Sequence, residues 1–156
     1  MTAGDLQKLR HHAIVAGYGL PGREAVAAIK QGGMPYFIIE YNHETTDRCA
    51  ASGIFIMTGD ARETQVLLTA GVERASMLVV TIPDDLVVLD IVSRALQINP
   101  KLQVIARCMY TSTGLELSRR AVTAIVAEQV VAREFSSILK HQFSAMEERD
   151  PKLPIS

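Results

Sequence analysis

A glycine-rich hexapeptide near the N-terminus constrains the fold of this chain more than any other segment. It consists of Gly17, Tyr18, Gly19, Leu20, Pro21 and Gly22 and matches the pattern G-x-G-x-x-G. An apolar run over residues 12–16 precedes it, a helix-like segment over 23–30 follows it, and a second apolar run over 36–39 ends at Glu40. A strand, a glycine turn, a helix, a strand and an acid form the order of a dinucleotide-binding unit. The sequence therefore predicts binding of an adenine-containing nucleotide.

Composition and charge restrict the class of protein. A chain of 156 residues with 48% hydrophobic and 21% charged residues has the size and composition of one soluble globular domain. The net charge of −1 gives no basic face for nucleic acid. Two cysteines form no disulfide framework, which favours a reducing cytoplasm, and no apolar run approaches the roughly 20 residues that span a bilayer.

The alternation of strands and helices continues beyond the first unit. Further strands are predicted over 54–57, 77–81, 103–107 and 124–126, and helices over 46–52, 63–70, 85–97 and 113–120. The strands are continuous apolar runs, as expected when helices cover both faces of a parallel sheet. We therefore expect an α/β fold, a Rossmann-like open parallel sheet with strand order 3-2-1-4-5-6.

A long C-terminal helix is predicted from residue 128 to about 146. Its apolar stripe consists of Val131, Phe135, Ile138, Phe143 and Met146. The segment 86–92 is also apolar on more than one face, so the two helices together predict a homodimer or a higher homo-oligomer. The alternative is that both helices pack on their own sheet. Residues 1–146 are expected to form one domain and 147–156 a charged, proline-bearing tail or linker.

The residues of the glycine turn have distinct expected roles. Gly17 permits the tight turn, Gly19 lets the backbone approach phosphate, and Gly22 permits close packing of helix on strand. Glu40 can accept hydrogen bonds from both ribose hydroxyls, and its charge disfavours a 2′-phosphate, so NAD-type or plain adenosine ligands are preferred over NADP. The alternative is a tight turn without a ligand and a solvated acid at Glu40.

Three further segments are expected at the same edge of the sheet. Asp60 and Ala61, in Gly59-Asp60-Ala61, follow the third strand, and Asp60 either accepts from an adenine amino group or caps the next helix. Thr81 and Ile82, in Thr81-Ile82-Pro83-Asp84, end the fourth strand and are expected to wall the phosphate side. Arg107 ends the fifth strand and either meets a phosphate or forms a surface ion pair.

Pro21 narrows the choice of ligand. It stands at a motif position whose N–H commonly faces the pyrophosphate, and proline has no N–H. Weaker pyrophosphate binding is therefore expected, which makes AMP a candidate beside NAD(H); ADP and ATP remain alternatives. The four histidines show no metal-ligand spacing, so no metal is predicted. No Tyr-x-x-x-Lys pair and no second domain for a substrate are present in the sequence, and an enzyme is not expected.

Several motifs together resemble a known family, the RCK N-terminal domain (regulator of potassium conductance), also called the TrkA-N or KTN nucleotide-binding domain. They are Leu9–Gly19, Glu40, Thr58–Ala61, Ala70–Ala75, Val79–Asp85, Ile105–Arg107 and the amphipathic last helix, and they cover roughly residues 9–146. The Leu-x-x-His lead-in to the first strand is most similar to the Kef-type antiporter branch. Many members carry arginine at the position of Leu20, which, with Pro21, disfavours triphosphate and pyrophosphate ligands here.

The resemblance implies a cytoplasmic nucleotide-sensing domain at the inner face of the membrane. Members bind NAD(H), ATP, ADP or AMP and control potassium channels, Trk-type uptake systems or Kef-type cation/proton antiporters, as dimers or larger rings. The membrane transporter or channel domain is expected on the same native chain or on a separate subunit. Two other functions stay open at this point: an NAD-dependent oxidoreductase fragment, and an assembly domain with a vestigial nucleotide cleft.

Overall fold

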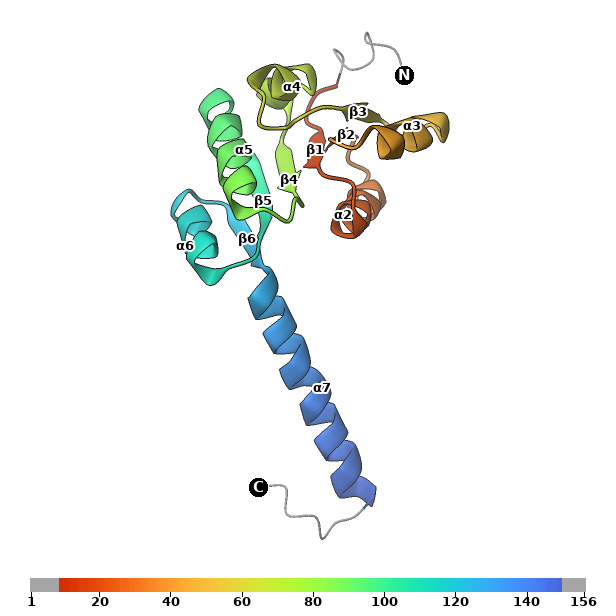
Figure 1. The fold of residues 1–156 in the computed structure, drawn as a ribbon, viewed down its shortest axis with the longest axis vertical. Coiled ribbons are helices and arrows are strands. Elements are labelled where there is room, and N and C mark those ends of the chain that lie inside the picture. The colour runs from red at the N-terminus through yellow and green to blue at the C-terminus, as the bar shows by residue number, and fades with distance from the viewer. Residues whose placement is uncertain (1–8, 150–156) are drawn as a thin grey trace.

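The computed structural model describes residues 9–149, which form a six-stranded parallel sheet flanked by helices (Figure 1). The strands are β1 (Ala13–Ala16), β2 (Tyr36–Glu40), β3 (Ile56–Thr58), β4 (Met77–Val80), β5 (Gln103–Cys108) and β6 (Thr123–Val126). The helices are α2 (Leu20–Gln31), α3 (His43–Ala51), α4 (Thr64–Thr69), α5 (Asp85–Ile98), α6 (Thr111–Arg119) and α7 (Ala127–Arg149), with a 3-10 helix η1 (Val72–Arg74). The order β3-β2-β1-β4-β5-β6 confirms the predicted fold class.

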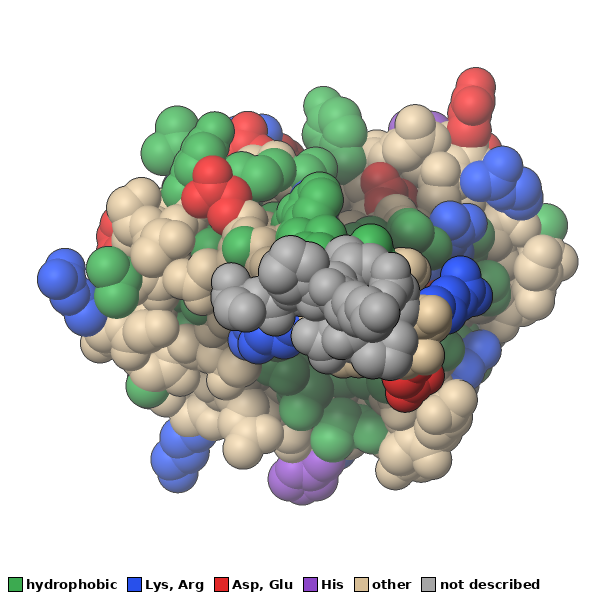
Figure 2. All heavy atoms as spheres, turned by 90° about the horizontal axis from the view of Figure 1, so that it is seen from below, with side chains coloured by type: hydrophobic (Ala, Val, Ile, Leu, Met, Phe, Trp, Pro, Cys, Tyr) green, Lys and Arg blue, Asp and Glu red, His purple; other side chains and the backbone are tan. Residues whose placement is uncertain are grey.

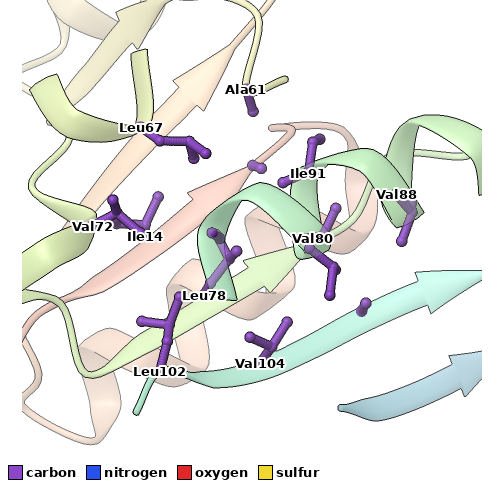
Figure 3. Packing of buried hydrophobic residues seen from close by; sticks show 14 of the residues in the cluster. Ile14, Ala61, Leu67, Val72, Leu78, Val80, Val88, Ile91, Leu102 and Val104 are labelled. Carbon is purple, nitrogen blue, oxygen red and sulfur yellow. The ribbon is translucent and has the colours of Figure 1, made fainter. Parts of the chain in front are cut away.

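One face of the sheet carries the larger hydrophobic core. Side chains from the central strands, including Ile14, Leu78 and Val104, pack there against Leu67 of α4 and Ile91 of α5 (Figure 3). These five side chains are at most 3% exposed. Because the strands are apolar on both faces, helices must cover both, and α4, α5 and α6 cover this one.

The opposite face carries a smaller core and is only partly covered. Val15, Ile38 and Val79 are buried there with Val26 of α2, and Ile29 of the same helix packs against them. Beyond α2, over β5 and β6, the sheet face borders a groove of about 280 Å³. We call this the open groove; its lining includes Ala25, Ile105, Arg107, Ile125, Val130 and Val131.

The last helix, α7, projects away from the body of the molecule (Figure 1). Its large apolar side chains are between 42% and 66% exposed: Val130, Val131, Phe135, Ile138, Leu139, Phe143 and Met146. Viewed from the side from which α7 projects, hydrophobic side chains are visible at the surface around its axis (Figure 2). For α7, the alternative that the helix packs on its own sheet is therefore wrong within one copy of the chain.

Helix α5 does pack on its own sheet through most of its apolar residues. Val88, Ile91 and Val92 are fully buried there, whereas Leu86 at its start is 79% exposed. The surplus apolar surface that the sequence indicated for this helix is thus reduced to its N-terminal turn.

Several element boundaries differ from those predicted. Helix α3 begins three residues early because the side chain of Asn42 accepts a hydrogen bond from Thr45 N (2.9 Å) and caps it. Helix α2 begins at Leu20 because proline fits the first turn of a helix. Helix α7 continues to Arg149, since glutamate and arginine are good helix formers, so the predicted tail begins inside the helix. The rest of that tail lies outside the described residues. None of the helices within residues 9–149 is long and apolar enough to cross a membrane.

Candidate functional site: a cleft at the carboxyl ends of the strands

A cleft of about 530 Å³ lies where the chain crosses from β1 to β4, at the carboxyl ends of the strands. Open α/β sheets bind ligands at this switch point. Eleven of the twelve predicted site residues line the cleft: Gly17, Tyr18, Gly19, Leu20, Pro21, Glu40, Asp60, Ala61, Thr81, Ile82 and Arg107. The exception is Gly22, which is buried beneath the turn.

The glycine turn is held by close backbone packing. Gly17 has a φ of +96°, and a Cβ there would lie 2.8 Å from Thr81 Oγ1. A Cβ on Gly22 would collide with the carbonyl oxygen of Gly17. At Gly19 a Cβ would meet nothing within 4 Å, so this position faces open space. Gly17 and Gly22 are therefore required by the fold, whereas Gly19 leaves room for a ligand beside the backbone.

Helix α2 begins directly at the cleft. Gly19 is its N-cap, without a side-chain cap, and Arg23 N donates to Gly19 O (3.0 Å). The first N–H groups of a helix have no intrahelical acceptor and carry partial positive charge, which suits an anion. Pro21 removes one of these donors. Leu20, 65% exposed, adds no charge.

Glu40 joins the two loops that border the cleft. Its Oε2 accepts from Tyr18 N (2.7 Å) and its Oε1 from Asn42 N (2.8 Å). A carboxylate offers about four lone-pair sites, so each oxygen keeps one for a further donor. The carboxylate is thus oriented by the backbone and can still accept two hydroxyl hydrogens.

Asp60 is held by its neighbour Arg62. Arg62 Nη2 donates to Asp60 Oδ2 (2.6 Å), and Arg62 N donates to Asp60 Oδ1 (2.9 Å). The Arg62 side chain lowers the pKa of Asp60, against the opposing effect of partial burial. The N-cap of α4 is Glu63, so the alternative that Asp60 caps this helix is wrong. An adenine amino group would compete with Arg62 for the carboxylate.

The residues that follow β4 form the opposite wall of the cleft. Thr81 Oγ1 donates to the carbonyl oxygens of Ala16 (3.2 Å) and Gly17 (3.1 Å), which ties this wall to the glycine turn. Asp84 accepts from Leu86 N (3.0 Å) and Val87 N (3.1 Å) and thereby caps α5.

The neighbouring carboxylate, Asp85, binds the backbone of the loop after β5. It accepts hydrogen bonds from Met109 N (2.6 Å) and Tyr110 N (3.3 Å). Burial opposes ionisation of Asp85, but hydrogen bonds from Thr113 and these two N–H groups outweigh it and lower its pKa. The carboxylate therefore stays ionised and fixes the loop that follows Arg107.

Arg107 lies one residue before the end of β5 and lines both the cleft and the open groove. The three ion pairs within residues 9–149 join Arg62 to Asp60, Arg94 to Asp90 and Arg120 to Glu116. The predicted alternative of a surface ion pair for Arg107 is thus wrong among the residues that the structure describes. Its charge still acts on Asp85 at longer range.

Sequence reasoning missed four residues of the cleft: Ile39, Tyr41, Arg62 and Val87. Tyr41 follows Glu40 directly and is 76% exposed, and Arg62 follows Ala61, so each adjoins a residue that was predicted. Extending each motif by one position would have found both. Gly59 and Pro83, which also line the cleft, lie within the segments already named. Among residues 9–149, no cluster of three or more His, Cys, Asp or Glu side chains is placed to hold a metal ion.

Residues 13–131 match the family model of the TrkA-N domain. The chain belongs to this family. Its relatives include the putative cation/proton antiporter YbaL of Escherichia coli, 27% identical over 83% of the chain, and the glutathione-regulated potassium-efflux protein KefC of Klebsiella pneumoniae, 28% identical over 78%. This TrkA-N chain spans only about a fifth to a quarter of their lengths, 24% and 20%.

Several solved structures have the same fold. The TrkA-N domain of E. coli YbaL aligns with a TM-score of 0.79 at 26% identity, over 85% of this chain and 98% of that one. The AMP-bound C-terminal domain of Kef from Shewanella denitrificans aligns with a TM-score of 0.65 at 21% identity, over 88% and 96%. The ADP-bound GsuK structure aligns with a TM-score of 0.73 at 21% identity, over 90% and 37%.

Proposed function

We propose that this TrkA-N chain is a nucleotide-sensing regulatory domain that controls potassium or cation transport. The observation that carries the proposal is the cleft. An oriented carboxylate, Glu40, faces it from β2, and the glycine turn and the start of α2 border it at the switch point. Carboxylate and helix terminus suit a ribose diol and a phosphate respectively. Family membership and the relatives' roles in potassium efflux and cation/proton antiport support the regulatory role.

The ligand that fits best is an adenine nucleotide with few phosphates. AMP is favoured over ADP and ATP because Pro21 offers no N–H, and Leu20 no positive charge, for additional phosphates. NAD(H) is the second candidate because Glu40 suits its adenosine ribose, although its pyrophosphate lacks the same donors. The AMP-bound and ADP-bound structures of the same fold support a nucleotide in this cleft.

The partner that best fits the exposed apolar face of α7 is a second copy of this chain. Helix α7 has 23 residues, a length of about 34 Å, and its apolar face is not covered by the body to which it belongs. A helix with an exposed apolar stripe is stabilised by packing that stripe on another molecule. We infer that α7 pairs two copies, that nucleotide binding alters their arrangement, and that the pair acts on a membrane transport domain from the cytoplasmic side.

Substitution of Glu40 tests the proposed site. Glu40→Ala removes the ribose acceptor, so AMP binding by isothermal titration calorimetry is expected to weaken at least about tenfold while the circular dichroism spectrum stays native. Glu40→Gln keeps an acceptor for one backbone N–H and separates loss of the loop contacts from loss of the charge. Glu44→Ala, on the exposed first turn of α3, is the matched control. Unchanged AMP affinity in both Glu40 variants would remove the site assignment.

A further inference from the structure

Arg107 is a lone cation in the open groove. Along β5, Val104, Ala106 and Cys108 belong to the larger core, whereas Ile105 and Arg107 alternate with them and line the groove on the other face. The strand partner of Arg107 in β6 is Ile125, which is 48% exposed. The groove lining around Arg107 is otherwise almost entirely apolar.

The charge of Arg107 opposes burial of the groove. Arg107 is half-buried, and no carboxylate that the structure describes lies within ion-pair distance of it; the charge of Asp85 acts on it at longer range. Covering an unpaired cation with apolar surface costs its hydration and gives no compensating charge. Any apolar surface that docks over the groove is therefore disfavoured while Arg107 has no anion.

The same residue lines the nucleotide cleft. Pro21, Thr81 and Arg107 border both the cleft and the open groove, so the two cavities adjoin along these side chains. A guanidinium pairs strongly with phosphate through two parallel hydrogen bonds. A phosphate in the cleft would supply the anion that the groove lacks.

The groove is also continuous with α7. Val130 and Val131, in its first turns, line the groove and begin the exposed apolar face of the helix. A second copy that packs on the apolar face of α7, beginning at the first turns of the helix, would also cover the open groove and Arg107. The occupant implied by this continuity is the second copy of the chain.

We propose that Arg107 couples phosphate in the cleft to the pairing of two chains through the open groove. This inference rests on the proposed function. Without a nucleotide, the unpaired guanidinium weakens the dimer; with a phosphate bound, Arg107 is neutralised and the groove accepts apolar surface. By linkage, the dimer then binds the phosphate-bearing ligand more tightly by the same factor.

The test uses the whole chain, with AMP and adenosine as probes, because adenosine occupies the ribose and base positions but has no phosphate. The dimer dissociation constant is measured by sedimentation equilibrium. In the wild type, saturating AMP is expected to tighten the dimer at least about fivefold, the lower end of typical coupling, and adenosine is expected to change it less than twofold. Arg107→Met, apolar and of similar length, should dimerise without nucleotide at least about fivefold more tightly than the wild type. It should not respond to AMP.

The controls separate this inference from the proposed function. Arg48→Met, on the exposed last turn of α3, should respond to AMP as the wild type does. Arg107→Lys keeps the charge and should retain a weak apo dimer, and Arg107→Gln, which removes the charge but stays polar, replaces Arg107→Met if that variant does not fold. An equal AMP response in wild type and Arg107→Met, or an equal effect of adenosine and AMP, overturns the coupling but leaves the nucleotide site intact. Absence of AMP and adenosine binding to the wild type overturns both.

Discussion

Single residues decide whether the cleft can exist, and the glycines of the turn do so for different reasons. Gly17→Ala places a Cβ at a φ of +96° and 2.8 Å from Thr81 Oγ1. Strain of this kind costs about 1–3 kcal/mol, so urea denaturation should show a loss of that size in the free energy of unfolding.

Gly19→Ala provides the contrast within the same turn. Its φ is −69° and a Cβ meets nothing within 4 Å, so the free energy of unfolding should fall by less than about 1 kcal/mol. Nucleotide affinity should nevertheless weaken, because the methyl group occupies the space beside the backbone. Equal destabilisation by both variants would contradict this division of roles.

A buried histidine makes the stability of the fold depend on pH. His12 is fully buried; its Nε2 lies 2.9 Å from Ala70 O, and its Nδ1 has no hydrogen-bond partner. Burial lowers its pKa below the ordinary value, against the hydrogen bond to Ala70, and repulsion from Arg74 and Arg10 lowers it further. The unfolded chain therefore binds the proton more readily, and stability present above about pH 6.5 is lost as the pH falls below it.

Urea denaturation at pH 7.5 and pH 5.0 measures this effect. The wild type should lose more stability between the two pH values than His12→Gln, which has no proton to take up at that position. His141→Gln, on the exposed surface of α7, should behave as the wild type does. Identical pH dependence in wild type and His12→Gln would show that His12 is not the group responsible.

At the scale of the elements, hydrophobic patterning predicted the parallel sheet, because strands covered on both faces must be apolar throughout. The strand order was predicted from the dinucleotide-binding unit at the start of the chain. Boundaries were predicted less well. The start of α3 depends on one side-chain hydrogen bond from Thr45 to Asn42, and a run of apolar residues carries no sign of it.

The candidate site shows a similar limit. The motif positions placed Gly17, Glu40 and Arg107 around one cleft, but spacing along the chain does not reveal the ion pair between Asp60 and Arg62. That pair depends on how the loop after β3 folds back on itself. The apolar stripe of α7 was visible in the sequence, whereas its separation from the body required the structure.

The exposed face of α7 leads to a prediction about assembly. Phe135→Asp places a charge on the apolar face, so sedimentation equilibrium should show the dimer weakened at least about tenfold, which corresponds to about 1.4 kcal/mol. Ser137→Asp adds the same charge outside the apolar stripe and should leave the dimer constant within twofold. The thermal unfolding of the body, whose core does not include α7, should change little in either variant. Equal weakening by both variants would exclude a specific interface.

For the whole molecule, sensing requires that a ligand bind one arrangement of the paired chains better than another. The cleft lies between the two halves of the sheet, and α7 follows β6 in the half that contains Arg107. A nucleotide that contacts both halves of the sheet could therefore influence the position of α7. The transport domain would then respond to the arrangement of the pair.

Thermal unfolding with AMP, NAD⁺, NADH, ADP, ATP and adenosine tests the central claim most directly. A ligand at 100 times its dissociation constant stabilises the folded state by about 2.7 kcal/mol, a rise of several degrees in Tm for a chain of this size. The account predicts such a rise with AMP or NAD(H), a smaller one with ATP, and its loss in Glu40→Ala. An unchanged Tm with every nucleotide would contradict it and would favour an assembly domain whose cleft no longer binds a ligand.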